Sequence, residues 1–289
     1  MSRQEPRSAA QESAPPAHDR DLRIVDGTGM SPQALASVFA GHDRALADGK
    51  GVLKRGRRTR VTAVCVGGAA LVVKEYLPRG LVDRAKVFLR GTRAGLAWRA
   101  AQRLAACGIA TPEPLAHVER GSSQFLITRR IEDGVALDRL LTDRFAGPLS
   151  REELAAKRQM LVQLGRWLRR IHDAAIYHND WSPKNFLTAE RPEGWRFYLL
   201  DLESVTFYKW LTPRRRRKNL SQLSDAPPGV TATDRMRVLL AYAGADVALT
   251  RGSFPRLVMR GTRRRSRQRA ARSNVEARRP RPAPEGIQE

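Results

Sequence analysis

The sequence contains only two cysteines among 289 residues and has no long hydrophobic run. Cys65 and Cys107 lie in apolar stretches without metal-ligand neighbours, which excludes a disulfide framework and predicts that Cys65 is a small core residue. No segment approaches the ~18 apolar residues of a membrane-spanning helix. The first 20 residues lack the apolar region of a signal peptide. We therefore expect a cytoplasmic protein, with any membrane association peripheral.

Acidic residues are scarce: 29 Asp and Glu stand against 53 Lys and Arg, which gives a formal net charge of +24. This charge indicates an anionic partner, namely a phosphorylated substrate, an anionic lipid surface or a nucleic acid. Part of the excess lies in an Arg- and Pro-rich stretch that runs from about Arg256 to the C-terminus. That stretch is predicted to be a disordered basic tail.

The residues that carry chemistry gather in two stretches. In the first, HNDWSPKNF, Asp180 follows His178 by two residues and precedes Asn185 by five; in the second, Asp201 ends a short apolar run that is predicted to be a buried strand. Phosphoryl transfer from ATP needs one carboxylate to position the acceptor hydroxyl, and a second carboxylate with an amide oxygen to hold Mg²⁺. The spacing H-x-D-x-x-x-x-N, with a later acid after a strand, is typical of kinases. His178 is expected to support the loop as a buried, hydrogen-bonded side chain.

Three strands joined by tight turns are predicted between Gly51 and Tyr76, and Gly67-Gly68 is a hairpin signal between the last two. The last strand contains Val72-Val73-Lys74, which is similar to the kinase strand whose lysine reaches the ATP phosphates. The turn after the first strand lacks the glycine pattern of a phosphate-covering loop. Lys54 and Arg57 either supply phosphate contacts there instead, or belong to an exposed charged hairpin.

Helical patterns occupy most of the remaining chain. One spans about 81–107 and contains no acidic residue from Arg84 to Gly108, whereas kinases carry in this helix a glutamate that pairs with the strand lysine. Either another acid pairs with Lys74, or Lys74 binds phosphate without that pair. Other helices are predicted from Ser31, over 136–144, from Ser150 to about Asp173, and over 233–242.

Two further strands are predicted around His117 and over 124–128. His117 is expected to be a strand surface residue, because no second ligand-type side chain accompanies it. The segment from Arg129 to Gly134, which includes Glu132, stands where a kinase chain crosses between lobes and offers backbone groups to adenine.

The sequence resembles the lipopolysaccharide kinase family, the Kdo and heptose kinases of the protein-kinase-like superfamily. The matching stretches are VVKEY at 72–76, GIATPEP at 108–114, HNDWSPKNFL at 178–187 and LLDL at 199–202. The resemblance covers roughly residues 50 to 245. It implies that Lys74 contacts the ATP phosphates, that Asp180 is the catalytic base, and that Asn185 and Asp201 bind magnesium. Ala97 stands where the helix glutamate is found in the family.

The predicted fold is therefore an α+β, two-lobed protein-kinase-like fold. Its parts are a disordered segment (1–22), an ATP-binding N-lobe (23–132), a helical C-lobe (133–250) and the basic tail (251–289). The expected function is ATP-dependent phosphorylation of a sugar hydroxyl on lipopolysaccharide inner core or a related glycoconjugate, at an anionic membrane surface.

Alternatives remain open at this point. The missing helix acid and glycine loop favour a weakly active or inactive kinase-like protein that binds ATP and acts as a membrane-surface scaffold. A serine/threonine or small-molecule kinase shares the same catalytic-loop pattern, although no A-P-E-like segment for a peptide acceptor is present. Nucleic-acid binding through the basic tail would be non-specific and salt-dependent, because no recognition module accompanies it.

Overall fold

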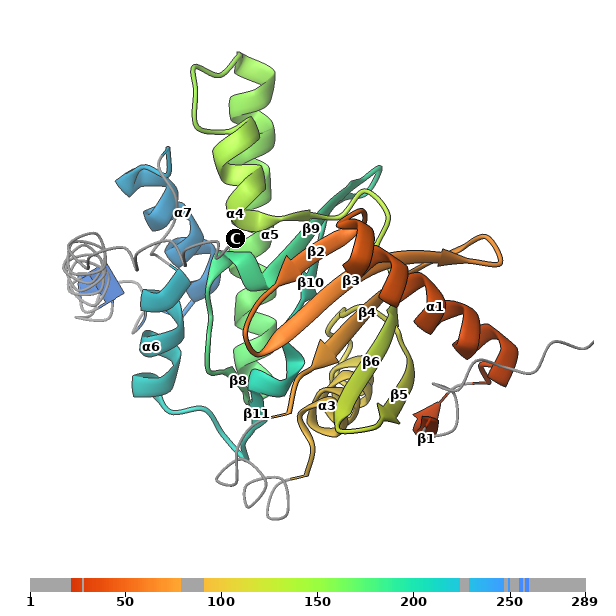
Figure 1. Cartoon of the computed structure of the whole chain (residues 1–289). Helices are drawn as coiled ribbons and strands as arrows, with labels where there is room; N and C mark the ends of the chain where they lie inside the picture. The colour runs from red at the N-terminus through yellow and green to blue at the C-terminus, as the bar shows by residue number, and fades with distance from the viewer. Residues whose placement is uncertain are drawn as a thin grey trace, which may run out of the picture. The chain divides into compact units, whose positions relative to one another are not determined.

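The computed structural model describes residues 22–27, 29–78, 91–223, 229–246, 249, 255–256 and 258–259. The chain divides into two compact units, which are described separately (Figure 1). The first comprises Met1–Ala94 and Pro114–Arg130, and the second comprises Gly95–Glu113 and Ile131–Glu289. Apart from Leu22 and the four residues 255, 256, 258 and 259, the predicted disordered segment and basic tail lie outside the described residues.

The first unit is built on a six-stranded antiparallel sheet in the order β1-β5-β6-β4-β3-β2. Its strands are β1 (Leu22–Gly27), β2 (Val52–Arg55), β3 (Thr59–Val66), β4 (Ala69–Tyr76), β5 (Pro114–Arg120) and β6 (Ser123–Arg129). The predicted hairpin turn is confirmed, because Gly67 and Gly68 join β3 to β4 with φ of 56° and 78°, values that other residues rarely adopt. The edge strand β1 was not predicted; most of its side chains are exposed, so it has no apolar alternation to signal a strand.

Helix α1 (Pro32–Asp48) covers one face of this sheet (Figure 1). Ser31 caps it as predicted, since its side chain accepts a hydrogen bond from the backbone N–H of Ala34 at 3.2 Å. Apolar side chains of α1, among them Leu35, Val38 and Phe39, pack into one core with residues of the sheet. The sheet therefore presents only its other face to a ligand or to another part of the protein.

Two predictions about single residues of this unit were wrong. Cys65 is exposed rather than in the core, because side chains alternate along β3 and Val64 takes the buried position beside it. His117 is buried rather than on the surface, with only 2% of its area exposed. Its Nδ1 lies 3.1 Å from a carboxylate oxygen of Asp26, a partner on β1, the strand that the sequence did not predict.

The second unit is mainly helical. Its helices are most of α3 (Arg93–Ala106), α4 (Leu137–Arg139), the π-helix η2 (Leu140–Arg144), α5 (Arg151–Asp173), the 3₁₀ turns η3 (Pro183–Asn185) and η4 (Leu202–Ser204), α6 (Pro213–Leu223) and α7 (Ala232–Ala243). Its strands are β7 (Val135–Ala136), β8 (Ile176–His178), β9 (Phe186–Arg191), β10 (Gly194–Leu199) and β11 (Val205–Phe207). None of the helices within the described residues is both long and apolar enough to cross a membrane.

Helix α5 is the centre of the second unit. The capping box predicted at its start is present, with Ser150 and Glu153 bonding each other's backbone N–H groups. Its Gly165 allows α7 to approach closely, because a Cβ at this position would lie 2.5 Å from the carbonyl oxygen of Val238. The C-terminal end of α5 leads directly into β8 and the loop that contains Asp180.

Candidate active site

The loop after β8 is organised by His178, whose side chain is completely buried. Its Nε2 lies 3.1 Å from the carbonyl oxygens of Leu200 and Asp201, and its Nδ1 accepts the backbone N–H of Asp180 at 3.2 Å. This pattern requires a neutral ring with the proton on Nε2. Burial lowers the pKa of His178, outweighing the opposing effect of Asp201 and the two carbonyls. The predicted supporting role of His178 is confirmed.

Backbone contacts place Asn185 and Asp201 on adjacent stretches. The Asn185 side chain donates to the carbonyl oxygen of Asp180 at 2.8 Å, and the Asn185 carbonyl accepts the N–H of Leu200 at 2.9 Å. Asp201 itself has left-handed backbone angles, φ 58° and ψ 49°, and its carboxylate accepts the Ser204 hydroxyl at 3.0 Å. Three residues predicted from two separate stretches of the sequence therefore meet around one short loop.

The chemistry of these side chains suits magnesium. Because Asn185 uses its amide nitrogen to hold the Asp180 carbonyl, its side-chain oxygen is the atom that is left to bind a ligand. With the Asp201 carboxylate it forms a pair of hard oxygen donors. Mg²⁺ is usually held by one or two such protein oxygens together with substrate phosphates. The described residues contain no cluster of three or more His, Cys, Asp or Glu that could hold a metal ion.

The Asp180 carboxylate is accessible. Its side chain is 48% exposed, and Lys184 lies 3.5 Å away in an ion pair that is also exposed. Exposed pairs of this kind contribute little to stability. Asp180 is thus held by its backbone while its carboxylate remains open to an acceptor.

Helix α6 supports this loop from beneath, a contact that the sequence did not reveal. Asn219 is completely buried and donates to the carbonyl oxygen of His178 at 2.8 Å. One turn later, Gln222 donates to the carbonyl oxygen of Asn179 at 3.0 Å. The only sequence signal was two amides near the end of an Arg-rich run, and their partners lie about 40 residues earlier in the chain.

We expect Asn219→Ala to lower kcat about tenfold, with little change in the KM for ATP, because the catalytic loop loses a fixed contact while no side chain of the loop changes. The free energy of unfolding should fall by about 2 kcal/mol, because the His178 carbonyl is left buried without its donor. Steady-state kinetics and urea unfolding test both values. Ser221→Ala is the matched control, since its hydroxyl bonds only the Arg217 and Val258 carbonyls and not the loop. Equal kcat in the two variants would contradict a positioning role.

Behind Asn219, a buried polar network joins α5, α6 and α7. His172 is fully buried, stacks on Trp181 with ring centroids 5.1 Å apart, and contacts the Tyr242 hydroxyl at 2.9 Å and the Asn219 amide oxygen at 3.3 Å. Burial lowers the pKa of His172 to about 3, and nearby Arg216 acts in the same direction. The network therefore holds a neutral imidazole.

This pKa predicts a pH-dependent stability. Below pH 6.5 the unfolded chain protonates His172 whereas the folded protein does not, so stability is complete above pH 6.5 and is lost as the pH falls toward 3. At about 1.4 kcal/mol per pH unit, roughly 2 kcal/mol should be lost between pH 7 and pH 5. Urea unfolding at both pH values measures the loss. A His172→Gln variant should show a clearly smaller one, and an unchanged loss would contradict the assignment.

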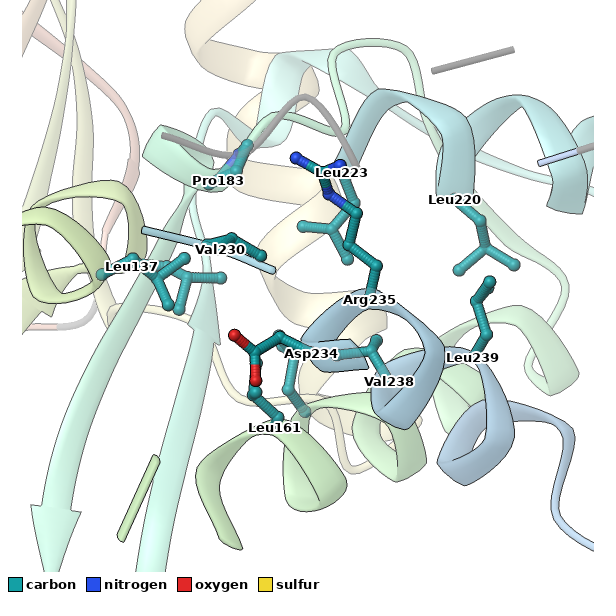
Figure 2. A pocket seen from close by; sticks show the side chains of 12 residues that line it. Leu137, Leu161, Pro183, Leu220, Leu223, Val230, Asp234, Arg235, Val238 and Leu239 are labelled. Carbon is teal, nitrogen blue, oxygen red and sulfur yellow. The ribbon is translucent and has the colours of Figure 1, made fainter. Parts of the chain in front are cut away.

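A small apolar cavity of about 40 Å³ lies beneath the loop, and Pro183 forms part of its wall (Figure 2). Leucine and valine side chains from α5, α6 and α7 make up most of the remainder. The charged Asp234 at its edge is paired with the buried Lys157 at 3.0 Å. The cavity is far smaller than the several hundred Å³ of a ligand pocket. It is a packing feature of the second unit and not a substrate site.

The predicted phosphate-binding residues belong to the first unit. Lys74 is half-buried in the middle of β4, opposite Leu126 of β6, with its ammonium 5.1 Å from the Tyr76 ring. Lys54 lies in β2 and Arg57 in the turn that follows, and both are exposed. Their contact with ATP remains a prediction.

Glu75, the acid next to Lys74 in the sequence, bonds other residues on the opposite face of the strand. Because side chains alternate along β4, it points to the face covered by α1, where it lies 3.6 Å from His42 and accepts the Ser123 hydroxyl at 3.1 Å. Burial would raise its pKa, but these two contacts and Arg60 together lower it. Glu75 is therefore not a substitute for the missing helix glutamate.

The other positions that the sequence associates with ATP binding, at Ala97 and Glu132, lie in the second unit. Ala97 of α3 stands where the resemblance predicts the helix glutamate. Its side chain is completely buried and, as alanine, has no polar atom that could pair with Lys74. Glu132 is exposed, and its carbonyl oxygen accepts a hydrogen bond from Arg191 at 3.4 Å. Two residues later, Gly134 packs closely against the Leu187 side chain, which would have to shift to admit a Cβ at this position. A backbone role of this segment toward adenine is not tested by these contacts.

Comparison with known proteins gives one family. Residues 53–242 match the lipopolysaccharide kinase (Kdo/WaaP) family. A 3-deoxy-D-manno-octulosonic acid kinase of Haemophilus influenzae is 25% identical over 145 residues, which cover 46% of this chain and 56% of that kinase. The lipopolysaccharide core heptose(I) kinase WaaP of Pseudomonas aeruginosa is 29% identical over 203 residues, covering 65% of this chain and 74% of the relative. The chain thus spans about half the length of the first relative and three quarters of the second.

Among solved structures, one described as WaaP in complex with acyl carrier protein is similar, with a TM-score of 0.54 and 22% sequence identity. The match covers 83% of this chain and 98% of that chain. At this identity the likeness concerns the fold. It confirms the predicted α+β fold, with a sheet-rich first part and a helical later part.

Proposed function

The chain belongs to the lipopolysaccharide kinase (Kdo/WaaP) family, and from this premise we propose that it transfers a phosphoryl group from ATP to a sugar hydroxyl of lipopolysaccharide inner core or a related glycoconjugate. The observation that carries the proposal is the loop around His178, which brings Asp180, Asn185 and Asp201 together as phosphoryl transfer requires. The acceptor class follows from the family and from the strong positive charge, which suits a phosphate-bearing glycolipid.

In this mechanism, Asp180 orients the acceptor hydroxyl and takes its proton as the hydroxyl oxygen attacks the terminal phosphorus of ATP, whose bond to the bridging oxygen breaks so that ADP leaves. Lys74 binds the ATP phosphates, with Lys54 of β2 and Arg57 of the turn after it as additional cations. Asn185 and Asp201 hold magnesium, which when bound offsets the negative charge that develops on the phosphates. Neutral His178 keeps the loop rigid, because it bonds both the Asp180 amide and the Asp201 carbonyl.

A second candidate rests on the buried Ala97. In kinases an acid in this helix holds the strand lysine, and here no acid is present along the whole of α3. This favours a kinase-like protein of low activity that binds ATP and serves as a scaffold. The complete Asp180, Asn185 and Asp201 set favours the enzyme.

ATP turnover by the purified protein with Mg²⁺, with and without extracted lipopolysaccharide, separates the two. Turnover that rises with lipopolysaccharide would support the kinase. ATP binding without turnover, whatever the acceptor, would support the scaffold. The cytoplasmic face of an inner membrane is the location that fits the proposed substrates.

A further inference from the structure

A segment that leads into α6 combines an exposed aromatic ring with a high density of positive charge. We call Tyr208–Lys218 the aromatic-basic segment. Trp210 is 65% exposed, the highest exposure of any large hydrophobic side chain within the described residues. A single exposed apolar residue needs no explanation. The surroundings of Trp210 are what make it significant.

No acidic residue occurs from Val205 to Leu223, whereas six basic residues do. One of them, Arg216, is paired with Asp173 at 2.9 Å. Lys209, Arg214, Arg217 and Lys218 form no ion pair with an acid in the part of the chain that the structure describes. Because residues three and four apart share a helix face, Arg214, Arg217 and Lys218 present their charges on one side of α6.

Aromatic rings lie beside three of the cations of this segment, namely Lys209, Arg215 and Lys218. The Arg215 guanidinium lies 3.9 Å from the centre of the Tyr208 ring, and the Lys218 ammonium lies 5.8 Å from that of Tyr177. The Lys209 ammonium lies 5.8 Å from the Trp210 ring. Contacts of this kind orient the side chains without neutralising them. These three side chains therefore keep their positive charge in a defined arrangement.

The first turn of α6 carries three arginines and no acid, although the N-terminal end of a helix is its positive end. This arrangement is unfavourable for the isolated helix. An anion at this end would reverse the effect, because it would meet both the helix dipole and the arginine side chains. The unfavourable placement of these arginines at the positive end of α6 thus points to an anionic ligand.

The segment is fixed to the catalytic loop within the second unit. Strand β11, which precedes it, pairs with β8 so that Val205 lies opposite His178. The N–H of Tyr208 donates to the carbonyl oxygen of Ala175 at 3.0 Å, and Asn219 of α6 bonds the loop directly. A surface that holds this segment therefore also holds the Asp180 loop.

We propose that the aromatic-basic segment docks the protein on an anionic lipid surface, with Trp210 in the interfacial layer and Lys209, Arg214, Arg217 and Lys218 against lipid phosphates. Tryptophan favours the boundary between water and lipid, because its ring is apolar and its N–H is polar. Basic residues near an anionic membrane each strengthen binding about fivefold. The choice of a lipid over a nucleic acid rests on the proposed function, in which the acceptor sugar is carried by a lipid.

The test uses the full chain and vesicles of equal parts phosphatidylcholine and phosphatidylglycerol, without ATP or acceptor. Replacing Arg214, Arg217 and Lys218 together by serine should weaken vesicle binding about a hundredfold. Trp210→Ala should weaken it about tenfold and remove the blue shift of tryptophan fluorescence on vesicle addition. Circular dichroism and the unfolding midpoint verify that each variant is folded.

Two matched controls make the result specific. Replacing Arg158, Arg166 and Arg196 by serine removes the same charge from other exposed positions of the second unit and should change binding less than about threefold. Leu240→Ala removes another exposed apolar side chain, 51% exposed on α7, and should leave binding unchanged. Equal losses in target and control variants would overturn the proposal, as would unchanged binding in the target variants. Duplex DNA is measured in parallel, and a loss of DNA binding equal to the loss of vesicle binding would also overturn it.

Turnover separates this proposal from the proposed function. Trp210→Ala should retain wild-type turnover on deacylated, soluble core oligosaccharide and lose about tenfold on vesicle-borne lipopolysaccharide. A wild-type protein that binds the vesicles through the segment and turns over neither acceptor would refute the kinase and leave the docking surface intact. Equal loss on both acceptors would refute the docking role in turnover.

Discussion

Asp180→Asn is expected to reduce turnover about a thousandfold while the protein keeps its fold. An amide cannot accept the proton of the acceptor hydroxyl, and a positioned general base contributes 10²- to 10⁴-fold. The stability should change little, because the Asp180 carboxylate is about half exposed and its ion pair with Lys184 is equally open to solvent. Steady-state turnover with Mg²⁺ and the thermal unfolding midpoint measure the two effects.

Asp143→Asn is the matched control for this prediction. Asp143 is an exposed aspartate of the same unit, so the substitution makes the same chemical change away from the loop. It should leave turnover at the wild-type value. Wild-type turnover in Asp180→Asn would reject Asp180 as the base, and a large fall in the unfolding midpoint would show that the residue is structural.

Asp201→Asn is expected to lower turnover by a comparable factor and to raise the Mg²⁺ concentration needed for half-maximal activity. The change removes the charge with which Asp201 would hold the metal. The backbone should tolerate it, because asparagine accepts the left-handed angles, φ 58° and ψ 49°, that this position requires. The side-chain oxygen that remains can still accept the Ser204 hydroxyl.

A magnesium titration of activity, with nucleotide binding measured calorimetrically, tests this prediction. Asp201→Ala is a useful second variant, because alanine removes the ligand and is also strained at a positive φ. We expect it to be inactive and less stable, whereas Asp201→Asn should keep the lowered turnover and be nearly as stable as the wild type. An unchanged magnesium requirement in Asp201→Asn would exclude Asp201 as a ligand.

Local sequence patterns were sufficient for most elements and for the catalytic loop. The capping box at Ser150, the hairpin glycines after β3 and the spacing from His178 to Asn185 each act between residues that are close in the sequence. Such signals are present in the chain before it folds. The last of these signals is also one of the stretches that carry the family resemblance, which the comparisons confirm.

The errors arose where a residue's environment is made by distant parts of the chain. Cys65 lies in an uninterrupted apolar stretch, so the sequence does not show which face of the strand it takes. His117 looked isolated because Asp26, which bonds it, lies 91 residues earlier on an edge strand with mostly exposed side chains. In both cases the missing information was strand pairing, which a local pattern does not contain.

By itself, the sequence predicted the α+β fold and supplied the reaction class proposed above with its candidate catalytic and metal-binding residues, because these depend on side-chain chemistry at short spacings. Only the tertiary structure decided which contacts hold these candidate residues in place. It showed that Asn219 and Gln222 hold the loop backbone, that Glu75 faces α1, and that an Arg-rich run becomes a helix beside an exposed Trp210. The physical reason is that hydrogen bonding and burial depend on which residues meet in space, and these bonded partners lie 33 to 48 residues apart in the chain.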